Sequence, residues 1–115
     1  MRFLMQYTPA DPLKGPPSPE MLAKMGAFMQ ASVRSGVLIA TGTVKPSAAN
    51  GMRIKLTNAA FDVIAGSPAQ AQRSGGWAIL NVDSQDHLEQ VTRQFLETAG
   101  DGDVEILEIT QVPLS

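Results

Sequence analysis

One folding unit, a strand followed by a helix and a second strand, occurs twice in these 115 residues. Runs of β-favouring apolar residues predict the four strands of the two copies at 2–7, 37–40, 77–82 and 104–109. A chain of this length builds a single hydrophobic core. We therefore expect one α+β domain, residues 1–115, in which two helices cover one face of a four-stranded sheet.

Both helices are predicted from capping residues and from apolar residues at helical spacing. Ser18, which precedes a proline, is a typical N-cap, and Ser84 or Asp83 can cap the second helix. Gly36 and Gly100 follow the two helices as stop residues. The expected inward faces are Met21, Leu22, Met25, Phe28, Met29, Ser32 and Val33 in the first helix, and Leu88, Val91, Phe95, Leu96 and Ala99 in the second.

Alternating residues around a turn at Asn58 predict a β-hairpin at about 52–65, between the two copies. Arg53 and Lys55 share one face of this hairpin, and apolar residues form the other. The following segment, 65–76, is rich in Gly, Ser and Gln, so we expect a loop there that forms the rim of a pocket.

Composition and charge argue against several classes of protein. The net charge of -2 and the scattered basic residues do not provide the basic surface that nucleic acids require. Cysteine is absent and His87 is the single histidine, so we expect neither a metal site nor a cofactor. No targeting signal and no apolar run of about 20 residues is visible. We expect a cytoplasmic protein that does not bind membranes.

The strands carry apolar residues toward both faces of the sheet. Phe3, Met5 and Tyr7 share one face of the first strand, and Leu4 is on the other. Two helices can cover only one face, and a face in contact with water normally alternates with polar residues. An uncovered apolar face is rare in a monomer. These residues therefore predict a homodimer in which the sheets of two copies pack on each other.

The chain resembles the YCII-related proteins, in the subgroup called DGPF-domain proteins, over nearly its whole length. The matching segments are 1–5, 18–28, 36–39, Pro46-Ser47, 75–77 and 105–112. The resemblance implies a ferredoxin-like βαβ-(β-hairpin)-βαβ fold with an antiparallel sheet, and a dimeric α/β barrel. Members of this family include proteins that look like cofactor-independent enzymes for small aromatic or phenolic compounds, and others that resemble accessory proteins of regulatory systems.

The chain departs from the family pattern at the acidic positions. The Asp-Gly-Pro-Phe segment corresponds to 65–68, which reads Ala-Gly-Ser-Pro. The carboxylate expected after the second strand is missing from 41–43, and Gln30 and Ala31 replace acids near the end of the first helix. No histidine matches the one proposed for a His–Asp pair in relatives. No catalytic residue can therefore be assigned from the resemblance.

Five residues are the ligand-binding candidates. Tyr7, Met25 and Trp77 are expected near an apolar cleft between the sheet and the helices, with Tyr7 and Trp77 on the sheet face opposite the helices or near its edge. Arg53 and Arg73 could bind an anionic ligand. The alternatives are ordinary core packing for the apolar and aromatic side chains and solvated surface charge for the arginines.

Three functions remain open at this point. The first is a homodimeric domain that binds a small aromatic or anionic molecule, or is otherwise non-catalytic; the missing acids favour it. The second is a cofactor-independent enzyme for a small aromatic or phenolic compound, with Tyr7, Arg53, Arg73 and Asp62 as its polar groups. The third is a regulatory or assembly partner that uses the hairpin and the long loop as its contact surface.

Overall fold

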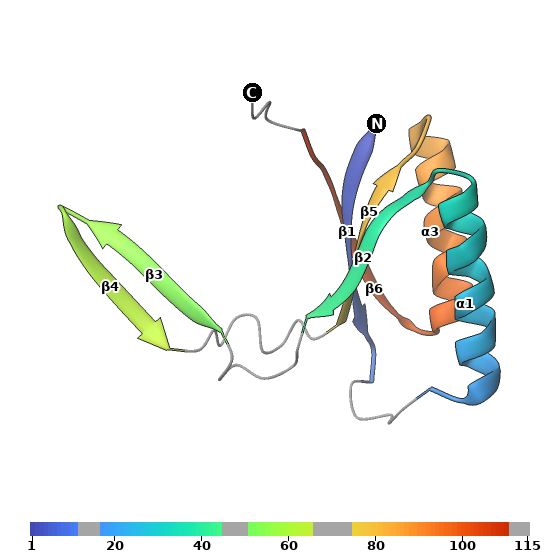
Figure 1. Cartoon of the computed structure of the whole chain (residues 1–115), viewed down its shortest axis with the longest axis horizontal. Helices are drawn as coiled ribbons and strands as arrows, with labels where there is room; N and C mark the ends of the chain where they lie inside the picture. Colours follow the sequence, from blue (N-terminus) through green and yellow to red (C-terminus); the bar gives the residue numbers. More distant parts are fainter. Residues whose placement is uncertain (12–16, 45–50, 66–74, 111–115) are drawn as a thin grey trace.

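The computed structural model describes residues 1–11, 17–44, 51–65 and 75–110. Its elements follow the predicted order of strands and helices, with the hairpin in the middle (Figure 1). Their bounds are β1 (Arg2–Pro9), α1 (Pro19–Arg34), β2 (Leu38–Val44), β3 (Met52–Thr57), β4 (Ala60–Ala65), β5 (Gly75–Asn81), α3 (Gln85–Ala99) and β6 (Gly102–Glu108).

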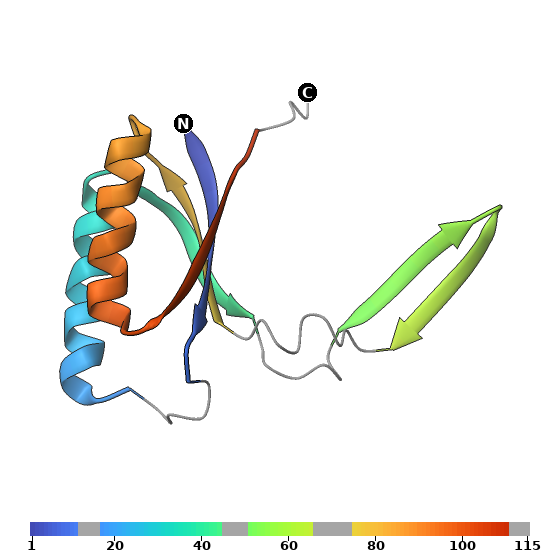
Figure 2. The ribbon, with the colours of Figure 1, turned by 180° about the vertical axis from the view of Figure 1, so that it is seen from behind.

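The main sheet has four strands in the order β2-β5-β1-β6, and every neighbouring pair is antiparallel. Both helices cover one face of this sheet and leave the other face uncovered (Figures 1 and 2). The predicted α+β class, with an antiparallel sheet and two helices on one face, is confirmed. The strand order is compatible with a ferredoxin-like fold.

The helix-covered face of the sheet contains most of the core. Phe3 lies opposite Leu80, and Met5 lies opposite Ala78, so these four side chains share that face. All four are buried, together with Val82. Because side chains alternate along a strand, the residues between them point to the uncovered face.

The uncovered face carries an apolar row that crosses all four strands. Ala40, Ile79, Leu4 and Leu107 are successive partners in the strand pairing. Leu107 is 51% exposed at the end of this row. The neighbouring row is more polar, because Gln6 pairs with Glu105. The predicted apolar residues are therefore present on both faces, although on the uncovered face they form a band and not a continuous surface.

The helices begin and end where the capping residues predict. The Ser18 hydroxyl accepts a hydrogen bond from the Met21 amide at 3.1 Å. Ser84 does the same for the His87 amide at 3.1 Å. Gly100 follows α3 with φ of 100°, a backbone conformation that carries a steric penalty for residues with a Cβ. These local signals fix the helix ends independently of the packing.

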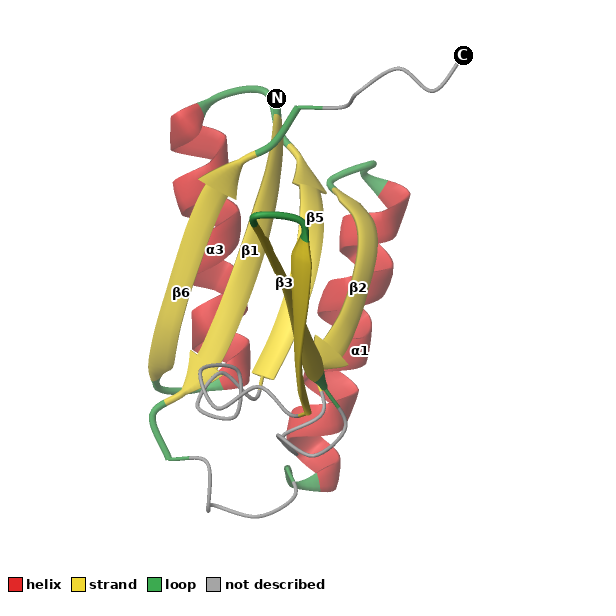
Figure 3. Ribbon diagram, turned by 90° about the vertical axis from the view of Figure 1, so that its left-hand side faces the viewer, coloured by secondary structure: helices red, strands yellow, loops and turns green. Residues whose placement is uncertain are grey.

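The second sheet is the hairpin β3–β4, which projects from the body of the protein on the side of the uncovered sheet face (Figures 1 and 3). Asn58 and Ala59 both have positive φ, as a two-residue type I′ turn requires. The predicted hairpin and its turn are confirmed. The long loop predicted at 65–76 lies mostly outside the described residues.

Replacement of Gly26 in α1 by alanine is expected to stabilise the protein by about 0.5–1 kcal/mol, because glycine is unfavourable inside a helix. A Cβ at Gly26 would meet no atom within 4 Å. The measurement is the free energy of unfolding from a urea titration. Gly42→Ala is the control, because its Cβ would lie 2.9 Å from the Trp77 ring and should destabilise the fold. A destabilising Gly26→Ala would contradict this account of α1.

Candidate functional site

A cavity of about 630 Å³ lies between α1 and the helix-covered face of the sheet. Its volume is in the range of small-molecule sites. Protein interiors are normally close-packed, with few voids larger than a water molecule, so a space of this size between a helix and a sheet needs an explanation. The side chains that line it come from the sheet, from α1 and from α3.

Small residues in the sheet create the floor of the cavity. On its helix-covered face, β5 lines the cavity with Gly76, Ala78 and Leu80, and Gly76 has no side chain to fill the space above it. A Cβ at Gly76 would have as its nearest neighbour the Gly42 carbonyl oxygen at 3.7 Å, so the space beside it is open. The sheet therefore leaves open space at Gly76, on the side of the cavity that faces α1.

The opposite wall belongs to α1, and four methionines dominate the interior. Met21, Met25 and Met29 recur on one side of α1, and Met5 lies below them on β1. None of the sixteen residues of α1, all of which the structure describes, is fully buried. Unbranched thioether side chains adapt to differently shaped neighbours. The predicted position of Met25 at a cleft between sheet and helices agrees with this geometry.

Tyr7 lines the cavity from β1 and connects it to α3. Its ring packs edge-on against Phe95, with the ring centroids 5.2 Å apart. Its hydroxyl points to the end of α3, where the carbonyl oxygens of Gly100 and Asp101 share its one hydrogen as acceptors, at 3.2 and 3.1 Å. Burial, and to a smaller extent the negative charge of Asp101, raises the pKa of Tyr7. The phenol is therefore protonated at neutral pH and already hydrogen-bonded.

The expected position of Tyr7 on the face opposite the helices is wrong. Tyr7 pairs with Val104 and alternates in phase with Met5, so its side chain is on the helix-covered face. Trp77, in contrast, pairs with Gln6 and belongs to the uncovered face, as expected. A Cβ at Gly42 would lie 2.9 Å from the indole, so the ring covers this glycine. Trp77 also borders the cavity.

Of the two arginine candidates, the structure describes only Arg53, and it is not part of this site. Arg53 lies on the exposed hairpin strand β3 and does not line the cavity. Arg73 lies outside the described residues. Asp62, also considered for catalysis, pairs with Lys55 on the hairpin. The structure thus brings together Tyr7, Met25 and Trp77 and leaves Arg53 apart from them.

The polar groups of the lining are mostly satisfied by the backbone. The Ser32 hydroxyl donates to the Phe28 carbonyl oxygen at 2.8 Å. The Thr41 hydroxyl donates to the Trp77 carbonyl oxygen at 2.8 Å. Since each hydroxyl has one hydrogen, both can only accept from a ligand. The cavity therefore presents a mostly apolar surface with a few polar side-chain groups, of which Ser32 and Thr41 offer acceptor oxygens.

Tyr7 is the only titratable side chain in the described part of the lining. A carboxylate, a histidine or a lysine, which general acid–base catalysis normally uses, is not found there. Nor do the described residues contain a group of three or more His, Cys, Asp or Glu side chains that could hold a metal ion. The arrangement is suited to binding an uncharged molecule and offers little for moving protons.

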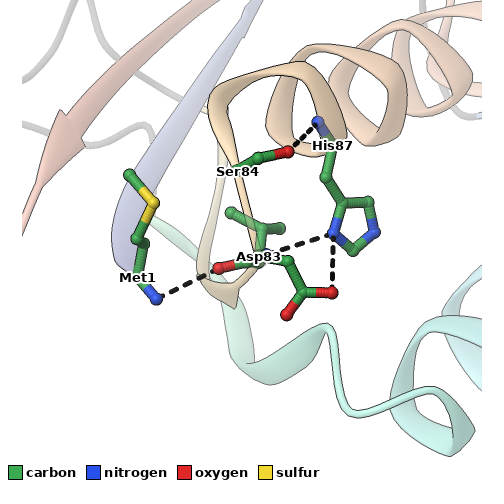
Figure 4. A network of polar contacts seen from close by, with 5 residues as sticks. Met1, Asp83, Ser84 and His87 are labelled. Carbon is green, nitrogen blue, oxygen red and sulfur yellow. Dashed lines mark hydrogen bonds and ion pairs between the residues drawn. The ribbon is translucent and has the colours of Figure 1, made fainter.

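His87 has a structural role at the other end of α3 (Figure 4). Its Nδ1 accepts a hydrogen bond from the Asp83 amide at 3.3 Å. The same Nδ1 lies 4.0 Å from the Asp83 carboxylate. His87 is not among the residues that line the cavity, so it does not take part in that site.

Sequence reasoning missed the residues that create the space. The sequence predicts a loop at Gly76 and a strand at Ala78, whereas in the structure both lie on one face of β5. Phe95 was predicted as core, and it is the ring that positions Tyr7.

No protein-family model matches the chain, and a search of curated proteins finds no relative. The resemblance to the YCII-related proteins therefore stays a prediction. In the described part of the chain, neither helix has the length and apolar character needed to cross a bilayer.

Replacement of Tyr7 by phenylalanine is expected to lower the free energy of unfolding by about 0.5–1.5 kcal/mol at neutral pH, because the hydroxyl bonds to two carbonyl oxygens are lost. A raised pKa in the folded state also makes the wild type lose stability as the pH rises through and above about 10, the ordinary value for tyrosine. The variant should lack this part of the alkaline loss. Urea titrations from pH 7 to pH 11 measure both effects, and parallel alkaline losses in the two proteins would disprove the assignment.

Proposed function

We propose that this protein is a homodimeric domain that binds a small, uncharged, apolar or aromatic molecule in the cavity beneath α1. The observation that carries the proposal is the composition of that cavity. It combines the volume of a ligand site with a lining of methionine, aromatic and aliphatic side chains. The few polar side-chain groups in the described lining are hydroxyls and the Trp77 indole N–H, and none of the residues there carries a charge at neutral pH.

Binding is favoured over catalysis by the state of the one ionisable group. The Tyr7 hydroxyl donates to backbone carbonyl oxygens, and its pKa is raised, so it is a poor base. Its proton is also hydrogen-bonded to backbone carbonyl oxygens at the end of α3 and does not point at a ligand. An enzyme for phenolic compounds would need a further acid or base that the described lining does not contain.

A neutral ligand is favoured over an anionic one. Moving a charged group into an apolar environment is unfavourable unless it gains a partner. Arg53 is exposed on the hairpin and cannot act as that partner within the cavity. An aromatic ring, in contrast, can pack against Phe28 and Phe95 and against the methionine side chains of α1.

The same proposal includes a YCII-like, ferredoxin-like architecture that assembles as a dimeric α/β barrel. Its support is the strand order β2-β5-β1-β6 and the apolar row from Ala40 to Leu107 on the uncovered face. Packing this face on the same face of a second copy would remove Leu107 and its neighbours in the row from water. An isologous contact of this kind is the commonest symmetry of soluble oligomers.

Two matched probes test the ligand class. We expect 2-naphthol to bind saturably in titration calorimetry and to raise the melting temperature, because it stabilises only the folded state. The anion 2-naphthoate, which has the same rings, should bind at least ~10-fold more weakly. The reaction mixture is also examined for products by chromatography. Turnover of the naphthol would favour the enzyme alternative, and equal binding of both probes would refute the proposed ligand class.

Variants that fill the cavity test whether the ligand binds there. Ala78→Leu places a larger side chain on the floor, and Ala99→Leu does so from α3. Each should weaken naphthol binding at least ~10-fold while the far-ultraviolet circular dichroism is unchanged. Ala27→Leu makes the same change on the exposed side of α1, outside the lining, and should leave binding unchanged. If all three variants bind like the wild type, the ligand does not occupy this cavity.

A further inference from the structure

The hairpin β3–β4 has one face that is almost entirely apolar and exposed. The strand pairing places Ile54 opposite Val63 and Leu56 opposite Phe61, with Met52 at the open end. These five side chains are between 57% and 70% exposed. All described residues of the hairpin, 51–65, are exposed, so the body of the same chain does not cover it.

Such a hairpin is not expected to be stable by itself. An isolated two-stranded hairpin is marginally stable at best in water, and stability requires further strands or a packed apolar face. A clean apolar face opposite a polar face with Arg53, Lys55 and Asp62 is the pattern of a sheet that packs on one side only. The pattern is therefore explained if another surface covers the apolar face.

We propose that the hairpin is an intersubunit arm, whose apolar face packs against a second copy of this chain in the homodimer. This inference rests on the dimer of the proposed function and adds to it the surface that completes the interface. The position of the hairpin supports it. Figure 3 shows the hairpin in front of the sheet face that the helices do not cover. A two-fold axis that covers this face with a second copy therefore brings that copy next to the hairpin.

The area required for a stable dimer also supports the proposal. Burying a fully exposed Val, Leu, Ile, Phe or Met side chain removes roughly 60–120 Å² of apolar surface from water. Because the five side chains are between 57% and 70% exposed, they provide about 200–400 Å² per copy. A typical stable interface buries about 800 Å² on each partner. The apolar row on the sheet is a single band, flanked by Gln6 and Glu105. The hairpin provides the area that this band alone does not.

Paired substitutions in the hairpin test the arm. Leu56→Thr with Phe61→Thr removes two facing apolar side chains and keeps residues that favour strands. Sedimentation equilibrium should show a dimer that dissociates about 100-fold more readily than the wild type. The matched control, Lys55→Thr with Asp62→Thr, changes the facing pair on the polar side without changing the net charge, and its dimer should be within about twofold of the wild type. A second test pair, Ile54→Thr with Val63→Thr, should reproduce the loss.

A variant in the sheet row distinguishes an error in the proposed arm from an error in the proposed dimer. Leu107→Thr weakens only the sheet row. A dimer that this variant weakens, but that both hairpin pairs leave intact, refutes the arm and keeps the dimer of the proposed function. A wild type that stays monomeric at micromolar concentration refutes both. The chain has no cysteine, so Phe61→Cys can be labelled with a fluorophore at this position alone. If the fluorophore is shielded from water in a monomer, the hairpin packs on the body of its own chain, and the arm is refuted.

Discussion

The packing of α1 on the sheet is the constraint on which the rest of the structure depends. At one end of the sheet, Phe3 and Val82 are buried below the helices and do not line the cavity. At the other end, the sheet offers Ala78 and Gly76 in the same layer. The helix is rigid, so large side chains at one end of the sheet hold it away from the small side chains at the other end. The space between the helix and these small side chains stays unfilled. The hollow is the cavity, and α1, which has no buried residue in the described structure, is its roof.

Most of the fold could be predicted because local signals and periodicity agree. Ser18, Ser84 and Gly100 set helix boundaries through their own hydrogen bonds and backbone conformation, without help from the core. The hairpin followed from alternation around Asn58. Alternation also identified which residues share a strand face. Two helices can cover only one face of the sheet, so the apolar residues on the other face required a separate explanation.

The site could be predicted only in part. Alternation shows that Tyr7 shares a face with Phe3 and Met5, but both faces of these strands are apolar, so it does not show which face meets the helices. That choice reversed the position expected for Tyr7. The volume of the cavity depends on how far α1 lies from the sheet, which no single residue encodes. The charge of Arg53 was visible in the sequence, whereas its distance from the cavity depends on where the hairpin projects.

Hydrogen exchange of the native protein tests the central claim, that α1 covers an unfilled apolar space. Without ligand, the amides in the middle of α1 should open with a lower free energy than those around Leu88 and Thr92, which are buried in α3. Saturation with a neutral aromatic compound should protect α1 and reduce this difference. Equal protection of the two helices without ligand, unchanged when the compound is added, would contradict the account.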